Sequence, residues 1–358
     1  MKNSSSQPDV RSEILLKWYN IYKRDLPWRK TRDPYLIWVS EIILQQTRVA
    51  QGLSYYLRFT EEFPDVKSLA EAKPEKVMKL WQGLGYYNRA INMIAASKMV
   101  MGAFNGSFPD SYADLIQLKG IGKYTAAAIA SISVNEPVAV VDGNVIRVIS
   151  RIFGVDNKNQ KKFDSSIQNL ANELLSKEKP GDHNQALMEF GALHCVPSNP
   201  LCSDCIFKKS CYAFQNNKVA SLPPKKVQTV KKTRYLHFLI ISDNIKIYVQ
   251  KRGKNDIWPD LYQFPVVETK SSSKKSTIHK EFEELLSRAI KKNTIKESNE
   301  SFRHLLTHQI IIGKFYSLKL NNLENLKDSK FVKINRNELK SLAFPKPLSS
   351  FIEKFLVD

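Results

Sequence analysis

The feature that most constrains this chain is the placement of its four cysteines, which all lie within residues 195–211. They are Cys195, Cys202, Cys205 and Cys211, with the spacing Cys-x6-Cys-x2-Cys-x5-Cys. Four thiolates so close together can hold either a tetrahedral Zn²⁺ ion or a [4Fe–4S] cube. Structural zinc sites more often pair two Cys-x2-Cys knuckles, whereas one compact loop supplies every sulfur here. The spacing therefore predicts a metal site and favours the iron–sulfur cluster over zinc.

We expect neither a secretory signal nor a membrane-spanning helix in this chain. Its start lacks the apolar run of a secretory signal, and no later apolar stretch approaches the ~18 residues of a membrane-spanning helix. We therefore expect a soluble cytoplasmic protein without membrane contact, in which the cysteines do not form a disulfide framework.

The charge of the chain indicates a polyanionic partner. Lys and Arg number 55 against 35 Asp and Glu, which gives a net charge of +20 over 358 residues. An excess of this size is typical of proteins that bind nucleic acid. A hydrophobic fraction of 42% is ordinary for a globular protein, and at ~150 residues per domain the length allows about two domains.

The hydrophobic pattern divides the chain into three parts. From about Ser12 to Phe214 the sequence shows helical periodicity without strand alternation, so residues 1–214 are expected to form a helical region. Residues 215–234 are rich in lysine, contain Pro223-Pro224, and are expected to form a basic linker. Residues 235–358 change to the pattern of β structure, so the expected fold is a mainly α N-terminal region followed by a smaller α/β domain. In that domain we expect strands at 235–241, 245–249 and 309–318 and helices at 276–290 and 348–356.

Two glycines mark a tight turn between helical runs, in Leu118-Lys-Gly-Ile-Gly-Lys-Tyr-Thr-Ala126. Gly120 and Gly122 would let the backbone approach a phosphate and direct the amide groups of a helix start toward it. The turn alone is weak evidence for DNA binding, because many helix–helix corners use glycine.

Two carboxyl groups stand out by their surroundings. Asp33-Pro34 predicts a helix start and a helix over 35–47, and Glu41 lies in its middle among tryptophan and isoleucine. A carboxyl group in apolar surroundings keeps its proton, so Glu41 is a candidate general acid, although a solvated helix face is the common alternative. Asp142 joins an apolar run to a helical stripe, so it fits an N-cap, a catalytic carboxylate or both.

The glycine turn, Asp142-Gly-Asn144 and the cysteine loop follow one another in an order that resembles the endonuclease III superfamily of helix–hairpin–helix DNA glycosylases. Three further strings closely resemble one branch of it, the adenine DNA glycosylase or MutY family. They are Leu26-Pro-Trp-Arg29, Trp38-Val-Ser-Glu-Ile-Ile-Leu-Gln-Gln-Thr47 and Gly83-Leu-Gly-Tyr-Tyr87. The resemblance implies a monomeric, nucleoid-associated base-excision repair enzyme that releases adenine mispaired with 8-oxoguanine or guanine in double-stranded DNA. It also implies that the [4Fe–4S] cluster is structural and associated with DNA binding.

The resemblance implies catalytic roles for particular residues. Adenine would be flipped out of the duplex, Glu41 would protonate it at N7, and Asp142 would stabilise the oxocarbenium-like sugar and assist the attacking water. Tyr124 stands where bifunctional relatives carry a lysine. Because a phenol cannot form an imine, we expect a monofunctional enzyme, with neighbouring Lys123 as a candidate for weak secondary lyase activity. Tyr124 and Asn144 would hold Asp142, the sugar or the water.

Other residues match those that contact adenine or enter the DNA helix. Arg29 and Glu189 would read the adenine edge, with Trp28 packed beside it. Gln46 and Tyr86 would enter the duplex at the lesion pair. The structural alternatives are an ion pair between Arg29 and Glu189 and core packing for Trp28 and Tyr86.

The C-terminal part resembles the MutT-like, or Nudix-like, domain of MutY proteins through Ile257-Trp-Pro-Asp-Leu-Tyr-Gln-Phe-Pro265. The helix His279-Lys-Glu-Phe-Glu-Glu-Leu-Leu286 lacks the Arg-Glu pair of a working Nudix hydrolase, so we expect no pyrophosphohydrolase activity. The resemblance implies instead that this domain reads 8-oxoguanine. Its reading loop usually contains Phe-Ser-His and here is Leu306-Thr-His308, in which Thr307 keeps a hydroxyl and Leu306 lacks the aromatic ring.

Two other functions stay open from the sequence alone. One is a pyrimidine- or mismatch-directed enzyme of the same superfamily, against which Glu41 and the C-terminal domain argue. The other is a non-catalytic iron–sulfur protein that binds DNA, since the glycine turn, the basic linker and the net charge suit binding by itself.

Overall fold

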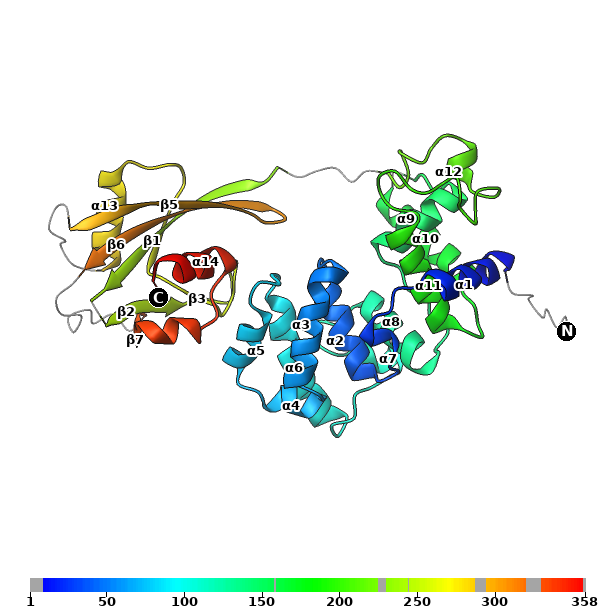
Figure 1. Ribbon diagram of the computed structural model, residues 1–358, viewed down its shortest axis with the longest axis horizontal. Helices are drawn as coiled ribbons and strands as arrows, with labels where there is room; N and C mark the ends of the chain where they lie inside the picture. The colour runs from blue at the N-terminus through cyan, green and yellow to red at the C-terminus, as the bar shows by residue number, and fades with distance from the viewer. Residues whose placement is uncertain are drawn as a thin grey trace. The chain divides into compact units, whose positions relative to one another are not determined.

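The computed structural model describes residues 9–157, 159–224, 230–243, 245–286, 294–319 and 330–356. These fall into two compact units, the first from residues 1–71 and 92–227 and the second from residues 72–91 and 228–358. Helices build the first unit, and a mixed sheet with flanking helices builds most of the second (Figure 1). The predicted fold class is confirmed.

The first unit consists of helices joined by short turns. They are α1 (Val10–Tyr22), α2 (Pro34–Leu44), α3 (Val49–Glu62), α4 (Val66–Glu71), α6 (Asn88–Ala103, whose first turn is counted with the second unit), α7 (Tyr112–Leu115), α8 (Lys123–Val134), α9 (Gly143–Phe153), α10 (Gln160–Leu174), α11 (Pro180–Leu193) and α12 (Tyr212–Gln215), with a short 3₁₀ helix at Pro27–Arg29.

Helix α2 begins where its sequence signal predicts and ends earlier than expected. The Asp33 side chain accepts a hydrogen bond from the backbone N–H of Tyr35, and Pro34 occupies the first helical position. The helix ends at Leu44 rather than continuing to Thr47. Gln46 has a φ of 56°, which an α-helix does not accommodate.

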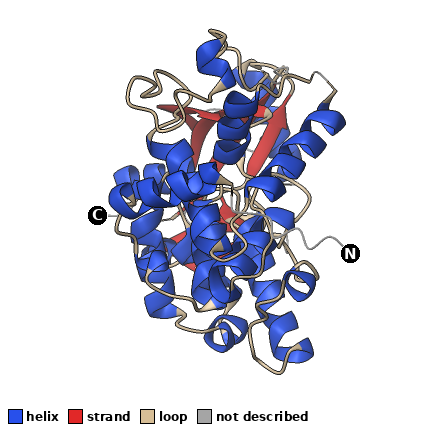
Figure 2. Ribbon diagram, turned by 90° about the vertical axis from the view of Figure 1, so that its right-hand side faces the viewer, coloured by secondary structure: helices blue, strands red, loops and turns tan. Residues whose placement is uncertain are grey.

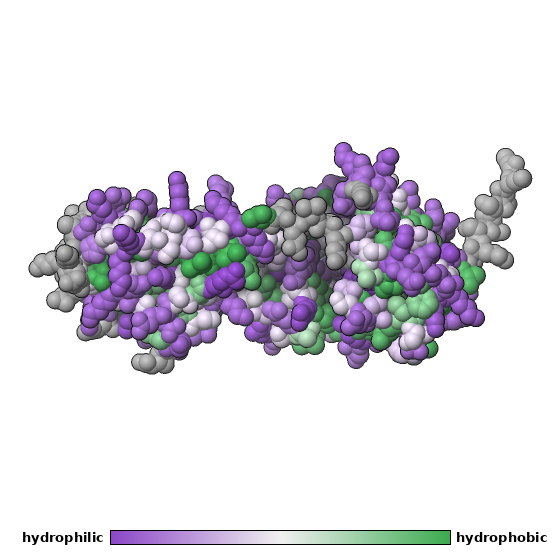
Figure 3. All heavy atoms as spheres, turned by 90° about the horizontal axis from the view of Figure 1, so that it is seen from above, coloured by the Kyte–Doolittle hydropathy of each residue, from purple (hydrophilic) through white to green (hydrophobic). Residues whose placement is uncertain are grey.

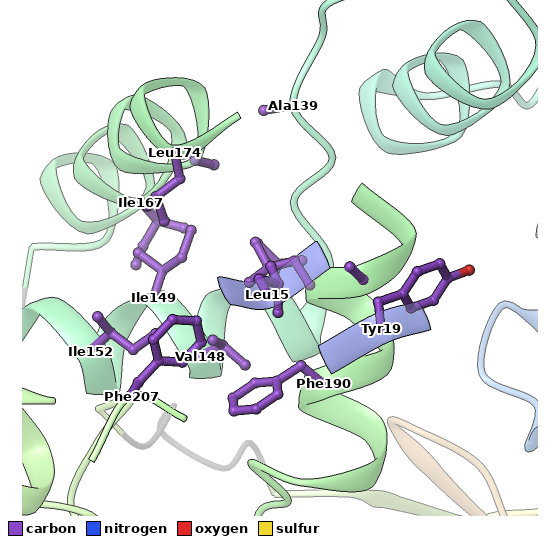
Figure 4. Close-up of a cluster of buried hydrophobic side chains, with 14 of the residues drawn as sticks. Leu15, Tyr19, Ala139, Val148, Ile149, Ile152, Ile167, Leu174, Phe190 and Phe207 are labelled. Atoms are coloured by element: carbon purple, nitrogen blue, oxygen red, sulfur yellow. The ribbon is translucent and has the colours of Figure 1, made fainter. Parts of the chain in front are cut away.

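One hydrophobic core of the first unit lies between α1, α9, α10 and α11. Leu15, Val148, Ile167 and Phe190 are each at most 1% exposed and belong to one hydrophobic cluster. Figure 4 shows Leu15, Val148 and Phe190 directed toward one another from their separate helices. Phe207, in the cysteine loop, packs edge-on against Phe190 with 5.3 Å between ring centroids, so the cysteine loop is anchored on this core.

The second unit is organised around a seven-stranded sheet. The strands are β1 (Lys232–Ser242), β2 (Lys246–Lys251), β3 (Tyr262–Gln263), β4 (Val266–Thr269), β5 (Ile295–Leu305), β6 (Gln309–Lys319) and β7 (Val332–Asn335), and the helices are α5 (Pro74–Trp81), α13 (Lys275–Leu285) and α14 (Lys346–Phe355), with a 3₁₀ helix at Arg336–Lys340. The sheet order is β3-β2-β1-β6-β5, with β4 paired to β1 and β7 to β2. β1 runs parallel to β6, whereas β5 and β6 form an antiparallel hairpin. Figure 2 shows the strands in red.

Helices α13 and α14 cover opposite faces of the sheet. Tyr316 on β6 packs against Phe282 of α13 at 5.4 Å, and its neighbour Phe315 stacks on Phe351 of α14 at 3.8 Å between ring centroids. Because successive side chains of a strand point to opposite faces, the two helices bury the sheet on both sides.

The surface visible in Figure 3 is mostly hydrophilic, with smaller hydrophobic patches. None of the helices in the described ranges combines the length and apolar character that crossing a bilayer requires.

Candidate active site

The site is built around Glu41, a carboxyl group in the middle of helix α2. Glu41 is only 8% exposed and lies next to the buried Ile42. Burial raises the pKa of Glu41 to about 7, although a hydrogen bond from Tyr124 and the charge of Arg29 act in the opposite direction. A carboxyl group with this pKa carries a proton for a large part of the time at neutral pH, as a general acid requires.

Tyr124 lies in the first turn of α8 and faces Glu41. Its hydroxyl donates a hydrogen bond of 2.5 Å to Oε2 of Glu41. Burial and the nearby carboxyl groups of Glu41 and Asp142 raise the pKa of Tyr124 above its usual value, so the phenol remains a donor. The structure thus brings Glu41 and Tyr124 together from helices far apart in the sequence.

Asp142 is the N-cap of helix α9 and is held on both oxygens. Its Oδ1 accepts a hydrogen bond of 2.7 Å from the backbone N–H of Val145, and its Oδ2 accepts one of 2.8 Å from Nδ2 of Asn144. Burial raises the pKa of Asp142, while these hydrogen bonds and the charge of Arg147 favour the anion. The helix start therefore does not lower this pKa below its usual value, because burial outweighs it.

A chain of hydrogen bonds leads from Asp142 to the cysteine loop. Nη2 of Arg147 donates to Oδ1 of Asn144 at 2.9 Å, and Nε of Arg147 donates to the carbonyl of Cys195 at 2.7 Å. Asn144 therefore bridges Asp142 and Arg147. The sequence pattern did not single out Arg147 as a functional residue. Its position one helical turn after Asn144 is the feature that could have indicated a contact between the two.

Glu189 on α11 is bound by two arginines. Nη1 and Nη2 of Arg29 donate to its carboxylate at 2.9 and 2.8 Å, and Arg24 adds three further hydrogen bonds. Burial alone would raise the pKa of Glu189, but the hydrogen bonds from Arg24 and Arg29 outweigh it and lower the pKa to about 2. The charge of Arg29 also acts to lower the pKa of Glu41, so the cluster and the acid influence each other electrostatically. Trp28 is 7% exposed and packs edge-on against Tyr56 at 5.1 Å, a core position.

Two of the residues expected to enter DNA have unusual backbones. Gln46 has a φ of 56° and Tyr86 a φ of 48°, in the left-handed region that few residues other than glycine adopt. Such strain is often found at functional positions. Within the second unit, Tyr86 is 52% exposed, and its hydroxyl lies 2.8 Å from Oγ1 of Thr307 in the turn between β5 and β6. His308 is exposed in the same turn.

The glycine turn precedes helix α8. Gly120 has a φ of +80°, and a Cβ there would lie 2.6 Å from Cβ of Asn92, so only glycine fits without displacement. Gly122 is the N-cap of α8. Because glycine has no side chain, the N-cap residue does not cover the backbone amide groups of the first turn. The next residue, Lys123, is exposed and lines a cavity of about 470 Å³ together with Tyr124 and Val141.

All four cysteines line one pocket, beside the guanidinium of Arg151. Arg151 is 3% exposed, donates to the carbonyls of Val196 and Pro197 at 2.8 and 3.1 Å, and lies 3.5 Å from the sulfur of Cys195. Burial raises the pKa of Cys205 to about 11, so a thiolate there needs a cationic partner. Over the described ranges, no three His, Cys, Asp or Glu side chains are arranged to hold a metal ion as the side chains stand.

Comparison with family models identifies two regions. Residues 39–175 match the model described as HhH-GPD superfamily base excision DNA repair protein, and residues 236–354 match the model described as NUDIX domain.

Comparison with individual proteins gives similar matches. The chain is 34% identical over 356 residues to an adenine DNA glycosylase of Buchnera aphidicola subsp. Baizongia pistaciae, covering 96% of this chain and 95% of that protein. It is 42% identical over 222 residues to an adenine DNA glycosylase of Rattus norvegicus, covering 58% of this chain and 43% of that protein. Among solved structures, a thermostable thymine-DNA glycosylase aligns with a TM-score of 0.53 and 29% identity, over 58% of this chain and 96% of that one.

Proposed function

The chain belongs to the adenine DNA glycosylase family of base-excision repair enzymes, and from this premise we propose that its substrate is adenine mispaired with 8-oxoguanine or guanine in double-stranded DNA. The observation that carries the proposal is the contact between the buried carboxyl group of Glu41 and the hydroxyl of Tyr124. Because the pKa of Glu41 is about 7, its carboxyl group is protonated for part of the time at neutral pH. It can therefore donate a proton to a purine, which leaves more readily when protonated.

The reaction begins with the adenine turned out of the duplex, at lower cost because the base is mispaired. Glu41 gives its proton to N7 of the adenine. The C1′–N9 bond breaks, its electron pair leaves with the base, and the sugar becomes oxocarbenium-like. Asp142, held by Asn144 and the backbone of Val145, stabilises this positive charge. A water molecule then bonds to C1′ and passes a proton to Asp142.

The enzyme is monofunctional in this proposal. A Schiff base with the sugar requires an amine, and Tyr124 offers a hydroxyl that is already engaged with Glu41. Lys123 lines the neighbouring cavity and is the candidate for weak lyase activity. Trapping with borohydride would measure this directly: little or no covalent product is expected, and any product should disappear in Lys123→Ala.

Base and lesion are read at separate places. Arg29 and Glu189 read the adenine edge beside Trp28, and Thr307 and His308 read the opposite 8-oxoguanine. Gln46 and Tyr86 enter the stack, which their left-handed backbones and the exposure of Tyr86 support. Gly120 and Gly122 bind a phosphate through backbone amides. The C-terminal domain hydrolyses no pyrophosphate in this proposal.

Cys195, Cys202, Cys205 and Cys211 hold a [4Fe–4S] cluster. Their shared pocket and the cationic Arg151 beside Cys195 fit a negatively charged group with several sulfur ligands. When bound, the cluster supplies a structural anchor for the loop that contacts DNA. Iron analysis of the purified protein tests this, and a colourless protein that contains zinc would contradict it.

A single-turnover assay on defined duplexes tests the proposed substrate, with hot alkali to reveal abasic sites. The protein should release adenine opposite 8-oxoguanine and opposite guanine as a monomer, and should leave oxidised pyrimidines in place. Preference for oxidised pyrimidines would favour a different member of the superfamily, and release of no base at all would favour a DNA-binding protein without catalysis.

A further inference from the structure

Arg24 is the closest partner of the carboxylate expected to read adenine, and neither its spacing nor its surroundings marked it in the sequence. Its Nε and Nη2 donate to Oε1 and Oε2 of Glu189 at 2.8 and 2.5 Å, and its backbone N–H donates to Oε1 at 3.0 Å. Arg29 binds the same two oxygens from its own fork. Glu189 is therefore held by two bidentate guanidinium groups in one buried position.

The two arginines differ in how firmly they are enclosed. The side chain of Arg24 is 34% exposed and that of Arg29 13%, while that of Glu189 is 1% exposed. A carboxylate offers about four lone-pair positions, and the donors from Arg24 and Arg29 already occupy them. A base that approaches Glu189 must therefore displace one of the five donors, and the remaining contacts of Arg24 and Arg29 keep the carboxylate in place.

The charge of Glu189 decides which base it can accept. An ionised carboxylate only accepts hydrogen bonds, so it binds the exocyclic amine of adenine and repels the carbonyl oxygen that hypoxanthine carries at the same position. A protonated carboxyl group could donate to that carbonyl. Burial favours the protonated form of Glu189, whereas the hydrogen bonds from Arg24 and Arg29 favour the ionised form.

We propose that Arg24 is a positioning residue that sets the base specificity of the pocket by holding Glu189 as an ionised, fixed hydrogen-bond acceptor. This inference rests on the proposed function, because it concerns the same base pocket. Arg24 need not touch the reacting atoms; it acts through Glu189.

The test is the ratio of single-turnover rates for adenine and hypoxanthine, each opposite 8-oxoguanine, measured from about pH 5.5 to about pH 8.5. The wild type should prefer adenine strongly across this range. Arg24→Ala should lower the ratio by roughly ten-fold or more, with the larger loss at the acidic end, because the pKa of Glu189 rises when one of its two guanidinium partners is removed. Arg24→Lys, which keeps the charge, should retain most of the ratio.

Two controls separate this effect from general damage. Lys30→Ala removes one positive charge from an exposed pair with Asp25 and should leave the ratio unchanged at every pH. Adding Arg24→Ala to Glu189→Gln should change the ratio no further than Glu189→Gln alone, because a residue that acts through Glu189 has nothing left to act on. Thermal unfolding monitors the fold of each variant, and if Arg24→Ala unfolds, Arg24→Gln replaces it against Arg24→Lys.

Two results would overturn the inference: an Arg24→Ala ratio equal to that of the wild type at all pH values, or an effect that adds fully to that of Glu189→Gln. Failure of the wild type to release adenine would instead contradict the proposed function.

Discussion

At the scale of single residues, Glu41 and Asp142 differ in their hydrogen bonds rather than in burial alone. Burial raises the pKa of both, but Asp142 is held by a backbone N–H and an amide, whereas Glu41 receives the hydroxyl of Tyr124. The sequence could predict the buried position of Glu41 and the N-cap position of Asp142, because a carboxyl group among isoleucines and one at a helix start are recognisable locally. It could not predict Arg24, whose partner Glu189 lies 165 residues away in the chain.

Tyr124→Phe should shift the pH dependence of the reaction upward. The hydroxyl of Tyr124 favours the ionised form of Glu41, so its removal should raise the pKa of Glu41 further above about 7. A general acid works while protonated, so the decline of the single-turnover rate with rising pH should move up by about one unit. A pH–rate profile measures this, and an unchanged alkaline limb would mean that Glu41 is not the proton donor.

Asp142→Asn should separate the two roles of that residue. Asparagine caps a helix about as well as aspartate, so the thermal unfolding midpoint should change little. The loss of negative charge beneath the sugar should slow base release by about 10²-fold or more. If the variant kept both its rate and its stability, Asp142 would be only a cap.

At the scale of elements, apolar patterning explains which strands were predictable. Strands β1, β2 and β6 follow the expected ranges 235–241, 245–249 and 309–318. β5 was missed because it is an edge strand whose sequence, from Ile295, is mostly polar and whose pairing with β6 is interrupted by a register shift. β3 and β4 are too short to show a period.

Gly120→Ala tests the turn that precedes α8. The φ of +80° and the 2.6 Å approach to Asn92 should make a methyl group cost about 1–2 kcal/mol or more. The thermal midpoint should fall, and affinity for undamaged duplex should weaken. Gly102→Ala in α6 is the matched control, because nothing lies within 4 Å of its Cβ position, and it should be neutral or slightly stabilising. Equal midpoints for both variants would contradict the assigned strain.

At the scale of the whole molecule, the net charge of +20 and membership of a DNA glycosylase family lead to the same partner. Charge and length can be read from the sequence alone, and an excess of positive charge is enough to predict binding to phosphate groups. The grouping of residues 72–91 with the C-terminal part of the chain could not be predicted, because it depends on contacts that no local pattern records.

Affinity for undamaged duplex should fall steeply with salt. Each phosphate neutralised by lysine or arginine releases counterions, so the logarithm of the binding constant should decrease linearly between about 50 and about 200 mM salt. Fluorescence anisotropy with a labelled duplex measures the slope. A slope near zero would show that the excess charge does not contact DNA.

The central claim is that Glu41 supplies a proton to the departing adenine. Glu41→Gln keeps an acceptor for Tyr124 but cannot donate a proton in the same way, and the exposed Glu61→Gln on α3 is its matched control. The most direct measurement is the single-turnover rate of adenine release from a duplex with adenine opposite 8-oxoguanine. We predict a loss of about 10²-fold or more for Glu41→Gln, with duplex affinity retained and Glu61→Gln unaffected. A Glu41→Gln rate equal to that of the wild type would contradict the account.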